Sequence, residues 1–514
     1  MAVLSNLHIT MRTALQRQQF LMAVCGAAVL SGVGVGILSV VLVQRSTTLG
    51  LLLPIALAGV VLMVAIGQVK RPLLALLAFS IPLHIDISFL YRDHDGGPPA
   101  LIISLTNMIL ALLVFLLLSR AGVRREMRLK SFPRVTVLIV IFFVFCLLSI
   151  LPAIDPLLTT FQVFEVVKGM ILYLVLINCV RDQRDITWVI GGLVASLFLQ
   201  SAIGLFHGVT RGDRLGLTFI GEIDVSSLPE DADVVLERSS GTFFHSNNFA
   251  MYLGMVVPVV SGMLLAPIRK YLKLVLMAVV CMALMSLFYT QSRGGWVGFG
   301  VSACIMGYFA VRKRYIQPAY ILMLFGLGIG GLTVFDTLSG NLITARIVSD
   351  GGSVQVRERL NEGALVIIAD HPVIGSGLNN YMQTVREYDD SGEYTNRGYL
   401  PVVHNVFLLL GAEIGLMGVG AFISLLIVLI RQTWSFAWSS GAASFSGLAV
   451  GLMASFQHVI THNMVEFGLV AESRLFTLFW FLAGLAVAIT QYKHPSSADA
   501  PCRDRSVEGV APYV

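Results

Sequence analysis

The chain has 514 residues, of which 56% are hydrophobic and 13% are charged, whereas soluble domains carry roughly 25% charged residues. This composition excludes an ordinary soluble domain and indicates an integral membrane protein. The formal net charge of +5 does not indicate a nucleic-acid partner, because the basic residues gather in alternate short loops between apolar segments.

Apolar segments of about 18 residues or more recur along the chain, and each is long enough to cross ~30 Å of hydrocarbon as an α-helix. We therefore predict an all-α polytopic membrane protein with about fourteen transmembrane helices. The predicted spans are 20–43, 48–67, 71–90, 100–119, 135–153, 159–180, 187–207, 246–266, 272–290, 295–312, 318–338, 403–431, 445–466 and 472–490. The first is interpreted as a retained span, because no small-residue pattern for signal-peptide cleavage is present. His84 and Asp86 interrupt the third span, and the acidic segment "YRDHDGG" at 91–97 is predicted to be a solvated loop.

The distribution of arginine and lysine predicts which loops face the cytoplasm. Basic residues gather at 70–71, 120–134, 269–273 and 312–314. With an even number of spans, both termini lie on this cytoplasmic side. The loops between them include the long segments 208–245 and 339–402, which are then extracytoplasmic, and loops of this length are usually functional or disordered. The cytoplasmic loops carry no GxxxxGKS/T or GxGxxG motif for a nucleotide, so chemistry is expected at the outer face.

Three arginines stand where predicted helices begin on the outer side. Arg238 precedes a glycine turn and the polar residues 246–248, which are candidates for capping the next span. Arg293 lies in the tight connection "QSRGGW", and Arg357 lies in the first turn of "VRERLNEGALVIIAD". The apolar residues of that segment recur at helical spacing, which predicts that the large outer loop contains an amphipathic helix on or near the membrane, ending before "HP". Each arginine alone fits a solvated or headgroup-binding residue, but the set predicts an anion-binding patch.

The segment "YLPVVHNVFLLLGAEIGLMG" begins the long apolar run after the second long outer loop. Its proline marks a helix start, which places His404 and Asn405 near the positive end of the helix dipole. Such a terminus attracts an anionic group and keeps a nearby imidazole neutral and able to accept a proton. The alternative is an interfacial histidine that only caps the helix, in which case Glu413 or Glu466 becomes the next candidate to accept the proton.

Further ionisable residues lie within the predicted spans. His458, His462 and Glu466 stand at i, i+4 and i+8, which predicts one polar helical face. A metal site is conceivable there, but the HExxH pattern is absent and no metal is predicted, so a face lining a cavity is favoured. Glu165 and Lys168, at i and i+3, either pair with each other or contact the substrate.

Four segments taken together resemble the O-antigen ligase-like family, in the family's order, over about residues 238–425. They are "SGTFFHSNNFAMYL", "TQSRGGWVGF", "RERLNEGALVIIADHPVIGSGLNNY" and "HNVFLLLGAEIGLMG". The family comprises O-antigen ligases, related polysaccharide polymerases and protein O-oligosaccharyltransferases of bacteria. The resemblance implies a GT-C-like, metal-independent membrane glycosyltransferase with no cofactor, acting at the periplasmic face of the inner membrane. It also implies an undecaprenyl-pyrophosphate-linked glycan as donor, and a glycan, the lipid A core or a protein as acceptor.

The same resemblance implies roles for individual residues. His404 matches the family's proposed general base, Arg293 and Arg357 match its outer-face arginines, and Arg238 is grouped with them. Family members often carry a tryptophan where this chain has Asn361. Ligase and polymerase activities stay open, because the acceptor is not encoded in a readable motif.

The motifs divide the chain into four regions. An N-terminal transmembrane bundle with the first long loop covers 1–237, and the catalytic region covers 238–430 and includes loop 339–402. A C-terminal transmembrane hairpin covers 431–490, and a cytoplasmic tail covers 491–514. A lipid-linked glycan flippase or transporter is the alternative function, although transporters place ionisable residues near the midplane between internal repeats. Here most candidates gather at one face, and no repeat is evident.

Overall fold

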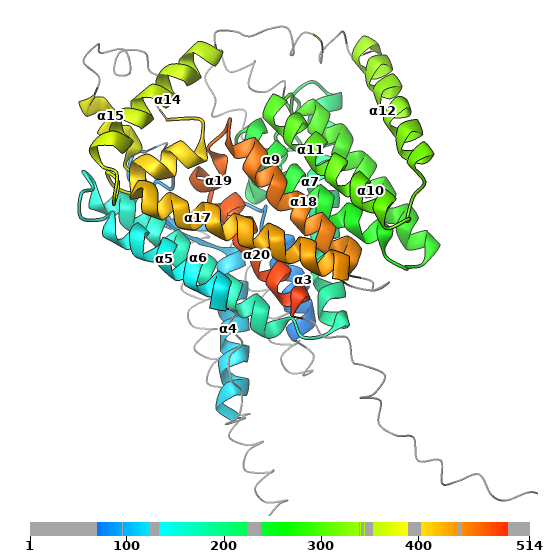
Figure 1. Cartoon of the computed structure of the whole chain (residues 1–514), viewed down its shortest axis with the longest axis horizontal. Coiled ribbons are helices and arrows are strands. Elements are labelled where there is room, and N and C mark those ends of the chain that lie inside the picture. The colour runs from blue at the N-terminus through cyan, green and yellow to red at the C-terminus, as the bar shows by residue number, and fades with distance from the viewer. Residues whose placement is uncertain are drawn as a thin grey trace, which may run out of the picture.

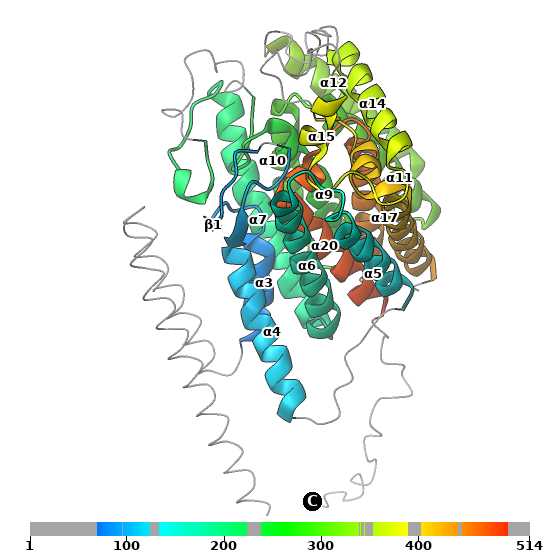
Figure 2. The same ribbon diagram turned by 90° about the vertical axis from the view of Figure 1, so that its left-hand side faces the viewer.

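A computed structural model of the chain describes residues 69–94, 96–123, 133–223, 238–338, 340, 344, 353–388, 402–439 and 445–491. The described residues form a bundle of helices packed side by side, from which α4 extends at one end (Figures 1 and 2). The predicted spans at 20–43 and 48–67 and nearly all of the predicted tail lie outside the described residues.

Most of the long helices lie close to predicted spans, and shorter elements stand between them. In chain order they are α3 (Lys70–Ser80), β1 (Asp86–Phe89), β2 (Leu101–Ser104), α4 (Leu105–Val123), α5 (Pro133–Leu148), α6 (Pro156–Cys179), α7 (Gln183–Val209), α9 (Ser246–Gly262), α10 (Lys270–Tyr289), α11 (Arg293–Arg312), α12 (Pro318–Leu338), α14 (Ser353–Asp370), α15 (Tyr381–Glu387), α17 (Val406–Ser439), α18 (Ser446–Asn463), α19 (Gly468–Ala471) and α20 (Ser473–Thr490). Within the described residues, seven helices are long and apolar enough to cross a membrane: α6, α7, α9 with the short turn after it, α10, α11, α17 and α20. The chain is therefore a multi-pass membrane protein, and its described residues are α-helical apart from loops and one short hairpin. The total of fourteen spans stays a prediction.

The third predicted span, 71–90, is wrong as a single helix. Helix α3 ends at Ser80, and its 11 residues cover only about 16 Å. After Pro82 the chain forms β1, which pairs antiparallel with β2 so that Asp86 lies opposite Ser104. The next predicted span, 100–119, likewise begins as a strand and becomes helical only after Ser104. Short apolar runs fit strands as well as helices, so periodicity does not separate the two here.

The predicted solvated loop at 91–97 is only partly exposed. Residues 91–93 are exposed, but His94 is buried, and its Nε2 lies 2.8 Å from Oδ1 of Asn379. The Nε2 of Gln383 lies 3.3 Å from the other ring nitrogen of His94. The loop therefore packs against a segment 285 residues later in the chain, which no local sequence pattern could indicate.

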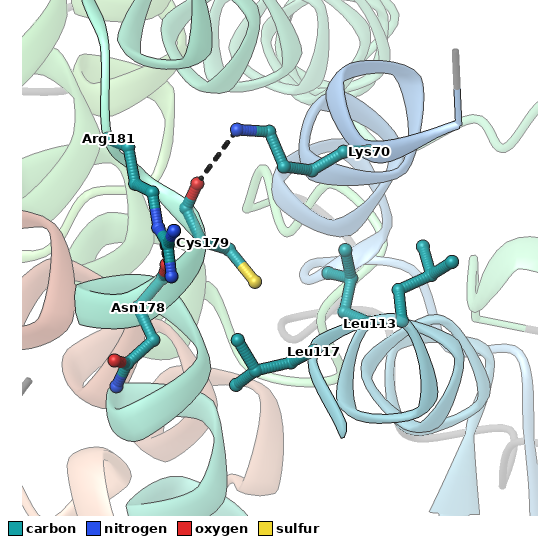
Figure 3. A pocket seen from close by; sticks show the side chains of 7 residues that line it. Lys70, Leu113, Leu117, Asn178, Cys179 and Arg181 are labelled. Atoms are coloured by element: carbon teal, nitrogen blue, oxygen red, sulfur yellow. Dashed lines mark hydrogen bonds between the residues drawn. The ribbon is translucent and has the colours of Figure 1, made fainter. Parts of the chain in front are cut away.

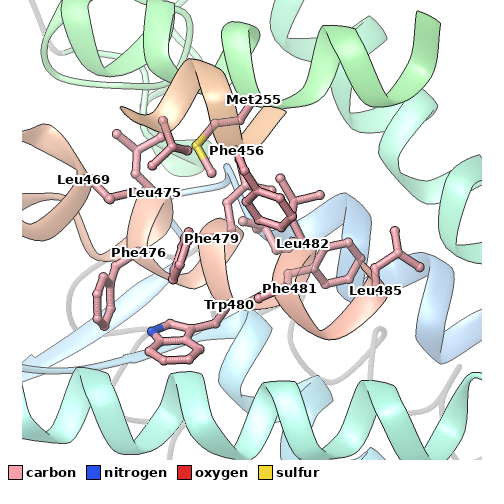
Figure 4. Close-up of a cluster of buried hydrophobic side chains, with 14 of the residues drawn as sticks. Met255, Phe456, Leu469, Leu475, Phe476, Phe479, Trp480, Phe481, Leu482 and Leu485 are labelled. Atoms are coloured by element: carbon pink, nitrogen blue, oxygen red, sulfur yellow. The ribbon is translucent and has the colours of Figure 1, made fainter. Parts of the chain in front are cut away.

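The centre of the core is α20, whose side chains are almost all buried between α6, α9, α17 and α18. Figure 4 shows its aromatic residues around Trp480, whose ring packs edge-on against Phe476 at 5.9 Å between centroids. On α6, Gly169 leaves the room that this indole occupies, because a Cβ there would collide with the ring. On α20, Gly484 lies directly against Leu176 of α6. Such small residues allow membrane helices to approach closely.

One end of the bundle is marked by basic residues. Lys70 Nζ donates to the carbonyl of Cys179 at 3.1 Å (Figure 3) and pairs with Asp185 at 2.5 Å. Lys313, just after α11, donates to the carbonyl of Trp438 at 2.7 Å. The pocket beside Lys70 has a volume of about 30 Å³, which is room for little more than a water molecule. We call this the basic end, and the positive-inside rule predicts that it faces the cytoplasm.

The opposite end holds the candidate site. Helices α7 and α10 run side by side in the same direction, since Ser286 donates to the carbonyl of Ser201 at 2.8 Å and Gly208 lies against Tyr289. Helix α11 starts at Arg293, just beyond the end of α10, and returns to the basic end. We call this opposite end, where α7, α10 and α18 finish and α9, α11 and α17 begin, the histidine end.

Candidate functional site

His404 lies just ahead of α17, at the histidine end. Its Nδ1 lies 3.3 Å from Oε1 of Glu466, and the exposed fractions of the two side chains are 30% and 6%. The ring of Phe467 packs edge-on against the imidazole at 5.0 Å between centroids. A carboxylate on Nδ1 favours the tautomer whose Nε2 is the free, basic nitrogen. His404 is therefore held from one side and partly exposed, as a proton acceptor requires.

Glu466 is the centre of a hydrogen-bond network. Its Oε2 accepts from Nδ2 of Asn247 at 2.6 Å, and its Oε1 accepts from the backbone N–H of Phe467 at 3.1 Å. Oδ1 of Asn247 accepts from Nη2 of Arg238 at 2.9 Å, and Nε of Arg238 donates to the carbonyl of Thr290 at 2.9 Å. The network joins the beginnings of α9 and α17 to the ends of α10 and α18, so it fixes the carboxylate that faces the histidine.

The surroundings of Glu466 keep it ionised. Burial alone would raise the pKa of this carboxyl, but the hydrogen bond from His404 and the positive charges of His404 and His462 outweigh burial and lower the pKa to about 2. A carboxylate with so low a pKa is a weak base at neutral pH. Glu466 is thus suited to orient His404 and to stabilise its protonated form, and not to accept the proton itself. Because the folded-state pKa lies below the ordinary value, the carboxylate stabilises the fold at neutral pH. This contribution is lost as the pH falls from about 4.5 towards 2.

His458 and His462 are packed inside the bundle. His462 Nδ1 lies 3.2 Å from His458 Nε2, and both side chains are buried. Gly254 of α9 and Gly298 of α11 lie against the His458 ring, since a Cβ at either position would collide with it. Among the described residues, no group of three histidine, cysteine, aspartate or glutamate side chains could hold a metal ion. The predicted single face with Glu466 is wrong, because α18 ends at Asn463 and the chain then turns Glu466 towards His404.

Arg293 and Arg357 reach the histidine end from two different helices. Arg293 is the first residue of α11, where Ser292 caps the helix by accepting from the N–H of Gly295 at 3.3 Å. The following residue, Gly294, lies directly against the ring of His462. Arg357 lies on α14, close enough for its charge to act on His462. The structure thus places the start of α11 against His462 and Arg357 within electrostatic reach of the same ring.

Helix α14 is held in place by its contact with α17. The helix predicted from the amphipathic pattern is confirmed, and it ends at Asp370. Its apolar face, with Leu360, Ala364 and Ile367, is buried, and α14 packs against α17. Part of the apolar surface of α14 is therefore used for protein packing, whereas Leu365 and Val366 of the same helix stay exposed.

The segment after α14 is anchored at a kink in α17. The N–H of Ser376 donates to the carbonyl of Ala412 at 2.8 Å, and the N–H of Leu416 donates to the carbonyl of Pro372 at 2.8 Å. The kink is at Gly415, with φ 75° and ψ 172°, a conformation that only glycine adopts readily. A Cβ at Gly415 would also collide with the backbone of Val373.

Gly415→Ala should therefore lower the free energy of unfolding by at least about 1–3 kcal/mol, the cost of one residue held in such a strained conformation. Gly420→Ala, on the same helix, is the matched control, because a Cβ there meets no atom within 4 Å. Thermal unfolding of both variants in detergent measures the difference. Equal melting temperatures for the two variants would contradict the role assigned to the kink.

Two further candidates are occupied by structural contacts. Oδ1 of Asn405 accepts from the backbone N–H groups of Phe407 and Leu408 at 3.0 and 3.2 Å, so this side chain caps α17. Glu413 lies about two turns further along α17 and accepts from the backbone N–H of Tyr381 at 3.2 Å. It holds the start of α15 and lies outside the His404 network.

Lys168 is also removed from the site. Its Nζ pairs with Glu165 at 2.5 Å and donates to the carbonyl of Ile102 at 2.9 Å. Of the two roles considered for this pair, the structure shows the ion pair.

The sequence pattern misassigned residues 246–248. These residues form the first turn of α9, which has no side-chain cap among them; the residue at the cap position is His245. Asn247 instead bridges Arg238 and Glu466. A polar residue at a helix start signals a cap or a network equally well, so the sequence alone does not separate these roles.

Comparison with known proteins adds one finding. No curated protein matches the chain. Residues 277–423 match the family model described as O-antigen ligase. This region contains Arg293, Arg357 and His404, begins after Arg238 and ends before Glu466. This part of the chain is therefore similar to the O-antigen ligase family.

Proposed function

We propose that the protein is a membrane glycosyltransferase of cell-surface polysaccharide biosynthesis, transferring or polymerising a glycan carried on undecaprenyl pyrophosphate. The observation that carries this proposal is the pair of His404 and Glu466, 3.3 Å apart, at the bundle end to which Arg293 and Arg357 also belong. The family match supports a ligase or polymerase type of membrane enzyme. The donor, the periplasmic face and the roles of the residues are part of the proposal.

The first part of the proposed reaction is proton removal. Nε2 of His404 takes the proton of an acceptor hydroxyl as its oxygen attacks the anomeric carbon of the donor. The bond from that carbon to the pyrophosphate oxygen breaks, and the leaving group keeps the electron pair. Glu466 stays ionised and stabilises the imidazolium that forms.

The second part is stabilisation of the leaving group. The pyrophosphate gains negative charge as the bond breaks, and guanidinium groups bind phosphate oxygens in pairs. We assign this role to Arg293 and Arg357. Arg238 donates to Asn247 and Thr290, so we assign it to positioning Glu466.

Glu466→Gln tests the orienting role. The rate should fall, but by less than the ~10²–10⁴-fold loss expected when the general base itself is removed, because the imidazole remains. The acid limb of the pH–rate profile should also move to lower pH, since a neutral amide no longer favours the protonated ring. Glu362→Gln, at an exposed position on α14, is the matched control. A reduced rate with an unmoved acid limb would show that Glu466 has only a structural role.

The periplasmic location of the site is tested by thiol labelling. In a cysteine-free background, Ser353→Cys at the start of α14 should react with an impermeant reagent on intact spheroplasts. Gln317→Cys, between α11 and α12 at the basic end, should react only after permeabilisation. The reverse pattern would place the site in the cytoplasm.

The acceptor is identified by a direct assay. Purified protein is incubated with a lipid-linked oligosaccharide and, in turn, with lipid A core, a second lipid-linked glycan or an acceptor protein. The mass of the product separates ligase, polymerase and protein glycosyltransferase, and the absence of any product would contradict the proposal.

A further inference from the structure

A groove lies on the flank of the bundle, away from the His404 network. It has a volume of about 740 Å³, and it is formed by α11, α17 and α18, with α18 packed against the other two. Its walls are mainly apolar and include Ile305, Ile427 and Ile460. Ile427 is 56% exposed among the described residues, so the groove opens sideways from the bundle.

The groove begins near the basic end. Tyr308 and Trp434 line it there and stack nearly parallel, with 6.4 Å between centroids and an angle of 12°. Trp438 of α17 and Lys313, just after α11, mark the basic end and lie close by. Tyrosine, tryptophan and lysine mark the level of the lipid headgroups in membrane proteins. The other limit of the groove is Ile460, two residues before His462.

Arg431 lines the groove on the same turn of α17 as Trp434. It is exposed, and it has no hydrogen bond or ion pair within the described parts of the chain. At the level of the lipid headgroups an exposed guanidinium can bind an anion, and its planar fork binds phosphate oxygens in pairs.

We propose that this groove binds an anionic phospholipid, with the lipid phosphate on Arg431 and an acyl chain along the isoleucines. The position of the charge favours this occupant. The isoprenoid tail of a lipid-linked donor carries its pyrophosphate at the histidine end, so such a tail would leave Arg431 without an anion. Basic side chains between membrane helices on the cytoplasmic side are typical sites for anionic headgroups.

Tryptophan quenching tests the proposal on the full chain, without donor or acceptor. The protein is placed in phosphatidylcholine vesicles that contain a small fraction of phosphatidylglycerol with brominated acyl chains. The matched sample has the same fraction of brominated phosphatidylcholine in place of the brominated phosphatidylglycerol. Half-maximal quenching should need roughly fivefold less of the anionic lipid, because a gain in affinity of about this size is expected from one basic residue at the membrane surface. Trp434→Phe should remove most of this preferential quenching.

Three substitutions give the decisive comparison. Arg431→Gln should abolish the preference, Arg431→Lys should keep part of it, and Arg269→Gln, at an exposed position at the start of α10, should leave it unchanged. Equal quenching by the two brominated lipids in the wild type, or an unchanged preference in Arg431→Gln, would overturn the proposal. The proposal would also be overturned if equimolar undecaprenyl phosphate displaced the brominated lipid in the wild type and in Arg431→Gln alike. The groove would then bind an isoprenoid chain independently of Arg431.

Discussion

Replacing His404 with alanine is expected to lower the turnover of glycan transfer by roughly 10²–10⁴-fold, the usual contribution of a positioned general base. The donor should still bind, because the arginines and the apolar helices remain. Glu466, with its pKa lowered to about 2, stays ionised at neutral pH and is too weak a base to replace the imidazole. Initial rates at saturating donor measure the loss.

Two variants separate the base from a helix cap. His404→Gln keeps much of the hydrogen-bonding shape but cannot accept the proton, so it should be nearly as slow as the alanine variant. His371→Ala, at the end of α14, is the matched control and should be active. An active glutamine variant with an unchanged pH profile would mean that His404 only orients or caps.

Replacing Arg293 or Arg357 with alanine should lower the rate by roughly 10²–10³-fold, as expected when one preorganised contact to a developing negative charge is lost. The two arginines belong to different helices, α11 and α14, which both approach His462, so neither can substitute for the other without moving its helix. Lysine should restore only part of the rate, because its point charge lacks the paired geometry of a guanidinium. The measurement is the single-turnover rate at saturating donor.

The control for this prediction lies on the same helix. Arg359→Ala removes an exposed arginine two residues from Arg357, and residues two apart on a helix face different directions. This variant should keep a rate close to that of the wild type. If Arg293→Ala and Arg357→Ala were both as active as the wild type, the leaving group would have to be stabilised by other residues.

Much of the helical framework could be predicted from the sequence because it depends on local quantities. Length and hydropathy placed α6, α7, α9, α10, α11 and α20 within a few residues of their observed bounds. The same criteria failed at 71–90, where an apolar run is divided between a short helix and a strand. Length and hydropathy also could not predict the burial of His94, since its partner Asn379 lies far away in the sequence.

The candidate site shows the same division. His404, Arg293 and Arg357 were recognisable because each stands beside a local signal, such as a proline, a glycine pair or an amphipathic pattern. The contact between His404 and Glu466 was not recognisable from the sequence, because 62 residues separate them and the contact depends on where α18 ends. A helix continued by three more residues would have kept Glu466 in line with His458 and His462, as the spacing suggested.

We propose that this protein breaks the bond between a glycan and its lipid pyrophosphate with His404 as the base. To test this, the wild type and His404→Ala are placed in proteoliposomes with a lipid-linked oligosaccharide and an acceptor, and both products are followed by mass. We expect equal amounts of glycosylated acceptor and free undecaprenyl pyrophosphate in the wild type, formed roughly 10²–10⁴-fold more slowly in the variant. Movement of the intact donor across the bilayer by both proteins, with the pyrophosphate link unbroken, would contradict it and identify a transporter.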